Sequence, residues 1–303
     1  MRRVRLVGLC VVAVFAIAAV QVASASAAAP EFGRCVKKAK AEGEGYSNAG
    51  CTTGVSSGAK YSWTAGVLDK DFTSTARFVA TPLLTICLKW QKLVGEGKTK
   101  EAEEYLEKHK LTAPECETII TENEGKEPAI LETTTGERVE CSGISASGEY
   151  TGTKTVGNIT VKLTGCEMNE ATCQSPGASA GEIVSDTLSG ALGIIKEEGL
   201  PVNNEVGISL AAASGETVTE FDCGTLSIVV TGSVIHQVET NKMLLEENEK
   251  YVQRKGEQKP EKFEVLPTDV LESTIDGVFH LQSGEALLTT LKNEEKVEVN
   301  SVV

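Results

Sequence analysis

Residues 129–166 read AILETTTGERVECSGISASGEYTGTKTVGNITVKLTGC. Apolar and polar residues alternate along this stretch, which is rich in Thr, Val, Ile and Gly. Turn signals interrupt it at Thr135-Gly136 and at Val156-Gly157-Asn158. Alternation with a period of two, broken by short turns, is typical of antiparallel strands that bury one face. The stretch therefore predicts two hairpins and a fold that is mainly β.

The same pattern continues toward the C-terminus. Ser214-Gly215 separates two alternating apolar runs and predicts a further hairpin. Residues 226–238 predict a longer strand with a bulge at Gly232, and residues 281–299 predict the strand that closes the sheet. Regularly spaced turn signals between short strands are typical of sandwiches and barrels. We therefore expect an antiparallel sandwich or open barrel.

Residues 82–120 depart from the β pattern and predict a small helical insertion. Thr81 and Pro82 supply an N-cap and a proline at the first helical position. Apolar residues then recur at helical spacing, and a second short helix follows. Thr112 and Glu115 form the capping-box pattern ahead of a third helix.

The segment 244–262 is highly charged. We interpret it as a solvated hairpin edge or loop, because Tyr251, Val252 and their apolar neighbours are not expected in a linker. No domain boundary is placed there. The sequence thus predicts a single β-rich domain over residues 30–303, including the insertion at 82–120, with two sheet-like subdomains as the alternative.

Eight of the nine cysteines lie after the N-terminal apolar segment that contains Cys10. An even number outside the cytoplasm indicates a disulfide framework. Metal binding is disfavoured, since no CxxC motif or Cys/His cluster exists. Cys35 with Cys51 closes a short local loop, and Cys87 with Cys116 joins two helical stripes, so both pairs are predicted.

Pairing among the remaining four cysteines stays open at this point. A turn at Val156-Gly157 would place Cys141 opposite Cys173, whereas the short loop from Cys166 to Cys173 is also closable. The four are Cys141, Cys166, Cys173 and Cys223.

Residues 1–29 predict a secretory signal peptide. A basic start is followed by an apolar run from Leu6 to Val22 and then by small residues. After cleavage no membrane span is expected. Loss of three arginines changes the net charge from −14 to −17, which disfavours nucleic acids and anionic membrane surfaces as partners. We expect a secreted or cell-surface protein.

No residue stands out as catalytic, metal-binding or cofactor-binding. The three histidines, His109, His236 and His280, have no credible partner nearby in sequence, and His236 continues an apolar face, as a core or edge histidine would. Nucleophile-elbow, P-loop, dinucleotide and EF-hand motifs are absent from the sequence. We interpret the many carboxylates as a solvated surface.

Aromatic residues in the glycine-rich N-terminal region are the candidate ligand contacts. Tyr46, Tyr61 and Trp63 stand singly among glycines and serines. A groove lined by these three rings would favour carbohydrate binding, since flat aromatic surfaces suit sugar rings.

Six short motifs carry a resemblance to a known family. They are Glu31-Phe32-Gly33-Arg34-Cys35, residues 46–52, residues 148–157, Thr164-Gly165-Cys166, Gly181-Glu182-Ile183-Val184 and Asn293-Glu294-Glu295. As a set they resemble an uncharacterised family of secreted actinobacterial proteins. The resemblance covers most of the mature chain, and residues 81–120 depart from it. It implies export and a cysteine-containing β-rich fold, with no established activity.

These patterns favour a non-catalytic secreted or cell-envelope protein with a binding or structural role. An extracellular glycan or another envelope component is the expected partner, and no cofactor is expected. Two alternatives stay open. One is a secreted hydrolase, which two close, buried carboxylates would support, and the other is a secreted inhibitor that presents the loop between Cys35 and Cys51.

Overall fold

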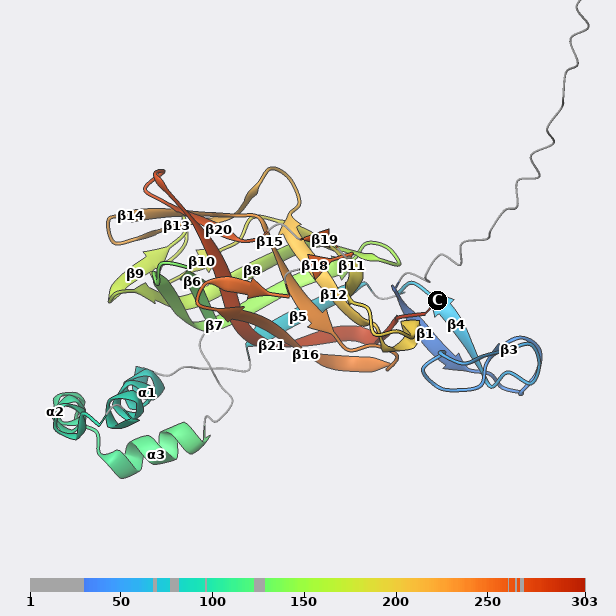
Figure 1. Ribbon diagram of the computed structural model, residues 1–303, viewed down its shortest axis with the longest axis horizontal. Coiled ribbons are helices and arrows are strands. Elements are labelled where there is room, and N and C mark those ends of the chain that lie inside the picture. Colours follow the sequence, from blue (N-terminus) through green and yellow to red (C-terminus); the bar gives the residue numbers. More distant parts are fainter. Residues whose placement is uncertain are drawn as a thin grey trace, which may run out of the picture.

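The computed structural model describes residues 30–67, 70–76, 82–95, 97–122, 129–260, 262–264, 266–267 and 270–302. The predicted signal peptide, residues 1–29, and the predicted N-cap Thr81 lie outside these ranges. Strands dominate the described chain, and three helices stand apart from them (Figure 1). Every pairing between named strands is antiparallel. The expected fold class is confirmed.

Eight strands pair in a closed circuit, which we call the first ring. In order they are β21 (Phe279–Asn300), β5 (Asp71–Ala76), β7 (Arg138–Tyr150), β8 (Thr155–Met168), β11 (Leu188–Lys196), β12 (Glu205–Ala212), β15 (Ser233–Val238) and β16 (Leu244–Arg254). The seam between β15 and β16 consists of a single pair, Gln237 with Lys250. The ring is therefore a barrel that is open along this seam for most of its length.

A second ring of eight strands shares the long strands β7, β8 and β21 with the first. Its other members are β6 (Ala129–Thr133), β9 (Ala171–Gln174), β13 (Thr217–Cys223), β14 (Leu226–Thr231) and β20 (Glu272–Ile275). The chain passes between the rings at Gly232, which links β14 to β15 with a φ of +92°. A Cβ at this glycine would lie 2.1 Å from the carbonyl oxygen of Val270, so only glycine fits the corner.

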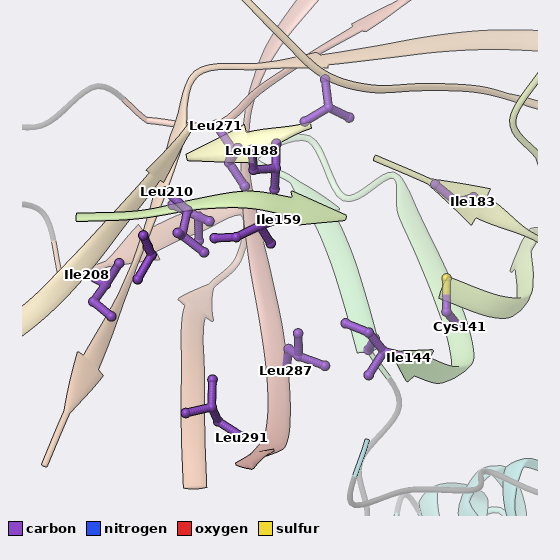
Figure 2. Packing of buried hydrophobic residues seen from close by; sticks show 14 of the residues in the cluster. Cys141, Ile144, Ile159, Ile183, Leu188, Ile208, Leu210, Leu271, Leu287 and Leu291 are labelled. Atoms are coloured by element: carbon purple, nitrogen blue, oxygen red, sulfur yellow. The ribbon is translucent and has the colours of Figure 1, made fainter. Parts of the chain in front are cut away.

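One hydrophobic core runs through both rings. Inward-facing residues alternate with outward-facing ones along the shared strands, as the period of two requires. Figure 2 shows Ile159, Leu188 and Leu287 among the side chains that project into the space between the strands. Burial of this apolar surface is the main stabilising contribution, at roughly 25 cal/mol per Å² removed from water.

Strands β5 and β6 are two collinear halves of one strand position. Both lie between β7 and β21. Ala76, the last residue of β5, lies opposite Thr289, and Ile130 of β6 lies opposite Ala286, three residues away along β21. The helical insertion thus interrupts a strand that would otherwise be continuous.

The insertion consists of α1 (Pro82–Gly95), α2 (Thr99–His109) and α3 (Ala113–Glu122). Half of the predicted capping box is confirmed, because the backbone N–H of Thr112 donates to the Glu115 carboxylate at 2.8 Å. The Thr112 hydroxyl donates to the same carboxylate at 2.7 Å. The helices bury a small core of their own that includes Trp90 and Leu106. They form a satellite unit, as their caps and apolar stripes predicted.

Four further strands form a small sheet at the other end of the molecule (Figure 1). They are β1 (Glu31–Lys37), β2 (Gly45–Tyr46), β3 (Gly54–Val55) and β4 (Tyr61–Ala65). β1 joins this sheet to β21 through the pair Glu31 and Asn300. The remaining elements are β10 (Ile183–Val184), a 3-10 helix (Pro201–Asn203), β17 (Glu257–Lys259), β18 (Lys262–Phe263) and β19 (Leu266–Pro267).

All eight predicted cysteines are paired. The two predicted pairs, Cys35–Cys51 and Cys87–Cys116, are confirmed. The other two bonds are Cys141–Cys166, between β7 and β8, and Cys173–Cys223, between β9 and β13. Both options left open by the sequence are thus wrong. Four disulfides indicate an oxidising compartment outside the cytoplasm.

Two predicted turns differ in the structure. The hairpin between β7 and β8 turns at residues 151–154, and Asn158 instead lies within β8 with a φ of +51°. Ser214-Gly215 does not close a hairpin, because β12 pairs with β11 and β15 whereas β13 pairs with β9 and β14. It connects the two rings. The hairpin at Thr135-Gly136, between β6 and β7, is confirmed.

Candidate functional site

The interior of the rings contains a cavity of about 150 Å³ with two unlike walls. Strands β7, β8, β11 and β12 supply an apolar wall that includes Ala146, Ile159 and Ile208. Strands β5, β15, β16 and β21 supply hydrogen-bonding and ionisable side chains to the same space. We call these the apolar wall and the polar wall. A mostly apolar cavity with a few convergent polar groups is the usual form of a small-molecule site.

Glu249 of β16 is the centre of the polar wall. Its side chain is buried, and one carboxylate oxygen accepts hydrogen bonds from the hydroxyls of Ser74, at 2.8 Å, and Thr289, at 2.7 Å. The other oxygen lies 3.2 Å from Nε2 of His236. Three neighbouring strands therefore converge on one carboxylate, and the hydrogen bonds offset part of the cost of burying it.

His236 of β15 completes this group. Only 3% of the residue is exposed. Burial lowers the pKa of His236 below its ordinary value, and Glu249 offsets only part of that effect, so the ring is neutral near pH 7. Because its Nε2 faces the Glu249 carboxylate, Nε2 carries the proton and Nδ1 is left as an acceptor. Nδ1 has no hydrogen-bond partner among the described residues.

Two more carboxyl groups line the cavity. Burial raises the pKa of Glu285, on β21, to about 7. Burial likewise raises the pKa of Glu247, on β16, to about 7, with further contributions from the nearby Glu249 and Glu239. The backbone N–H of Glu239 donates to Glu247 and opposes the shift. Both acids thus change charge near neutral pH.

Two tyrosines frame the polar wall. The ring of Tyr251 lies 4.9 Å from that of His236, centroid to centroid, and burial raises the pKa of Tyr251 well above its ordinary value. On the β7 side, the Tyr150 hydroxyl donates to Oδ1 of Asn293 at 2.8 Å. Tyr150 also packs edge-to-face on Phe32 and Phe72, which fixes its position.

The aromatic residues singled out from the sequence lie elsewhere, on the N-terminal sheet. Tyr46 of β2 and Tyr61 of β4 are direct cross-strand partners, and Trp63 follows two residues along β4 on the same face. All three are half-buried. The Trp63 indole N–H donates to Glu31 at 2.7 Å, and its ring lies against Gly33, where a Cβ would be 2.5 Å away. The structure thus places the three residues on one face of the N-terminal sheet, outside the cavity.

The polar wall was missed by the sequence analysis. Glu247, Glu249 and Tyr251 occupy alternate positions of β16, so they share its inward face, whereas Glu246 and Lys250 are exposed. The segment was expected to be a solvated hairpin edge or loop. The hairpin is confirmed, since β16 pairs with β17, but the inward face of β16 is not solvated, because it is a wall of the first ring. Period-two spacing was the available signal, although acids on the inward face concealed it. For His236, the predicted core position is confirmed.

Within the ranges that the structure covers, no group of three or more His, Cys, Asp or Glu side chains is arranged to hold a metal ion. No helix among the described residues has the length and apolar character needed to cross a bilayer. Comparisons with protein-family models, with curated proteins and with solved structures gave no match.

Proposed function

We propose that this chain is a secreted, non-catalytic binding protein that holds a small, mostly apolar molecule inside the first ring. The observation that carries the proposal is the cavity with its apolar wall. Eight-stranded barrels are wide enough to hold one small ligand, and a cavity of about 150 Å³ matches a ligand the size of benzene.

The hydrogen-bond order within the polar wall disfavours hydrolysis by a serine nucleophile. A nucleophilic serine needs a histidine beside it as general base, with a carboxylate behind the histidine. Here Glu249 lies between the two, because Ser74 and His236 both contact its carboxylate. The Ser74 hydroxyl donates a hydrogen bond to a Glu249 oxygen that also accepts one from Thr289. The arrangement therefore orients the carboxylate and does not activate the serine.

A cavity-filling substitution tests the proposal. Ala146 lies on the apolar wall, and Ala146→Phe would occupy the space. Ser147→Phe, on the exposed face of the same strand, is the matched control. We expect saturating toluene to raise the unfolding temperature of the wild type and the control, since a ligand that binds only the folded state stabilises it. Toluene should have no effect on Ala146→Phe. Equal responses from all three proteins, or none from the wild type, would overturn the proposal.

Export is the second part of the proposal. The disulfides and the signal-peptide pattern of residues 1–29 support it. N-terminal sequencing of protein recovered from the culture medium tests it, with cleavage expected near residues 25–29. Retention of the full-length chain in the cytoplasm would contradict it.

A second candidate is glycan binding at the face formed by Tyr46, Tyr61 and Trp63. The observation in its favour is that the three rings share one half-buried face. Tyr46→Ala should weaken retention on cell-wall glycan by several-fold if the face binds sugars, whereas the cavity variant Ala146→Phe should leave retention unchanged. Equal retention of Tyr46→Ala and wild type would exclude this candidate.

A further inference from the structure

The polar wall presents acceptors to the cavity. Nδ1 of His236 is an unpartnered acceptor on a side chain of which 3% is exposed. The carboxyl groups of Glu247, Glu249 and Glu285 line the same space. An unpaired polar group buried in this way destabilises the folded protein unless a ligand supplies a hydrogen-bond partner. A ligand that complements these acceptors must carry several N–H or O–H donors.

The charges around the cavity indicate which kind of hydrogen-bond donor the ligand should carry. Among the described residues that line it, the acidic ones are Glu239, Glu247, Glu249 and Glu285, and the basic ones are His236 and Lys242. Lys242 is paired with Glu239 at 2.8 Å, and burial keeps His236 neutral. The net field inside the cavity is therefore negative, and it favours a cationic ligand group.

Other classes of ligand would leave the polar groups of this wall with fewer hydrogen-bond or charge partners. An anionic head, such as that of a fatty acid, would face several carboxyl groups with no unpaired cation to meet it. A pure hydrocarbon would leave Nδ1 of His236 without a partner. A cation beside the ring of Tyr251 would gain a further attraction to the face of that ring.

We propose that the cavity takes small apolar amines, with the protonated amino group donating to Nδ1 of His236 and to the carboxylate of Glu285 while the apolar body lies against the opposite wall. Glu249, which lies at Nε2 on the other side of the imidazole ring, contributes negative charge and makes no direct contact. The inference rests on the proposed function, because it assigns the chemistry of the same site's ligand. It commits to a primary or secondary ammonium group, which has both the charge and the donors.

Four matched probes test the inference by isothermal titration calorimetry near neutral pH: benzylamine, benzyl alcohol, toluene and benzoate. We expect benzylamine to bind about tenfold more tightly than benzyl alcohol, as hydrogen bonds between charged groups allow. Toluene should bind more weakly still, and benzoate should not bind. If benzylamine binds no more tightly than benzyl alcohol, the inference is wrong and the proposed function stands. If none of the four binds, the proposed function itself fails.

Two variants localise the contact. Glu285→Gln should lower the affinity for benzylamine by about tenfold and leave that for toluene unchanged. Glu294→Gln, exposed on the same strand, should change neither. If Glu285→Gln weakens toluene and benzylamine equally, the side chain shapes the cavity and the proposed ammonium contact is wrong. The same conclusion holds if Glu285→Gln changes neither affinity.

Discussion

Glu285→Gln should stabilise the protein at alkaline pH and leave its stability unchanged in acid. Burial raises the pKa of Glu285 from an ordinary 4.5 to about 7, so the folded state holds its proton longer than the unfolded state does. Stability therefore falls as the pH rises from about 4.5 to about 7. At about 1.4 kcal/mol per pH unit, full ionisation of the buried group costs up to about 3 kcal/mol.

Glutamine imitates the protonated acid at every pH and removes that cost. Urea unfolding followed by circular dichroism, with the disulfides intact, should show equal free energies of unfolding for variant and wild type at about pH 4. At about pH 8 the variant should be more stable by up to about 3 kcal/mol. The neighbouring Glu247 titrates in the same range and remains in both proteins. Glu294→Gln, on the exposed face of the same strand, should behave as wild type. An equal loss of stability at both pH values would refute the assignment of the shift to burial.

Three further predictions concern the framework of the fold. Thiol titration of the unfolded, unreduced mature protein should find no reactive thiol, and four or more would contradict the disulfide framework. Replacing residues 77–129 by a two-residue Gly-Ser link should leave the β signal in circular dichroism unchanged, because β5 and β6 share one strand position. Loss of that signal would show that the helices are needed by the main core. Gly256→Ala should destabilise the fold by at least about 2 kcal/mol more than Gly277→Ala. Both glycines have a positive φ, but a Cβ at Gly256 would lie 2.3 Å from the backbone of Thr133 and Thr134, whereas Gly277 faces open space. Equal urea midpoints for the two variants would contradict this prediction, because they would show that the backbone shifts to make room for the Cβ.

The sequence predicted those parts of the fold that local chemistry determines. The insertion was predictable because helix caps and apolar stripes are read from neighbouring residues, as the bonds between Thr112 and Glu115 illustrate. The long strand β21 was predictable because inward and outward residues alternate over its middle part, residues 287–294. The two local disulfides followed from the same kind of short-range reasoning.

Strand partners were less predictable, because pairing is a non-local property. A hairpin centred near Gly157 would put Cys141 opposite Cys173. The turn at residues 151–154 puts it opposite Cys166. An error of a few residues in the position of one turn thus gave the wrong disulfide partner, because the turn sets the register of both long strands.

The polar wall could not be found by searching for apolar alternation. Strand β16 places Glu247 and Glu249 toward a cavity, where a packed core would require apolar side chains. What stabilises Glu249 there is a set of hydroxyl groups from β5 and β21, strands far away in the sequence. Sequence patterns are expected to miss a site of this kind, because its residues break the apolar alternation that identifies the inward face of a strand.

Strand β21 pairs with five others, β1, β5, β6, β16 and β20. Ribosomes make residues 279–300 after all five of these partner strands, so neither ring can close during most of translation. Long-range pairings of this kind form slowly, because the entropy of closing a large loop is lost before any contact is gained. Both rings therefore stay open, with the strands that pair with β21 left as unpaired edges, until this long strand has emerged. Dependence on chaperones that cover these open edges follows from the order in which the strands are made.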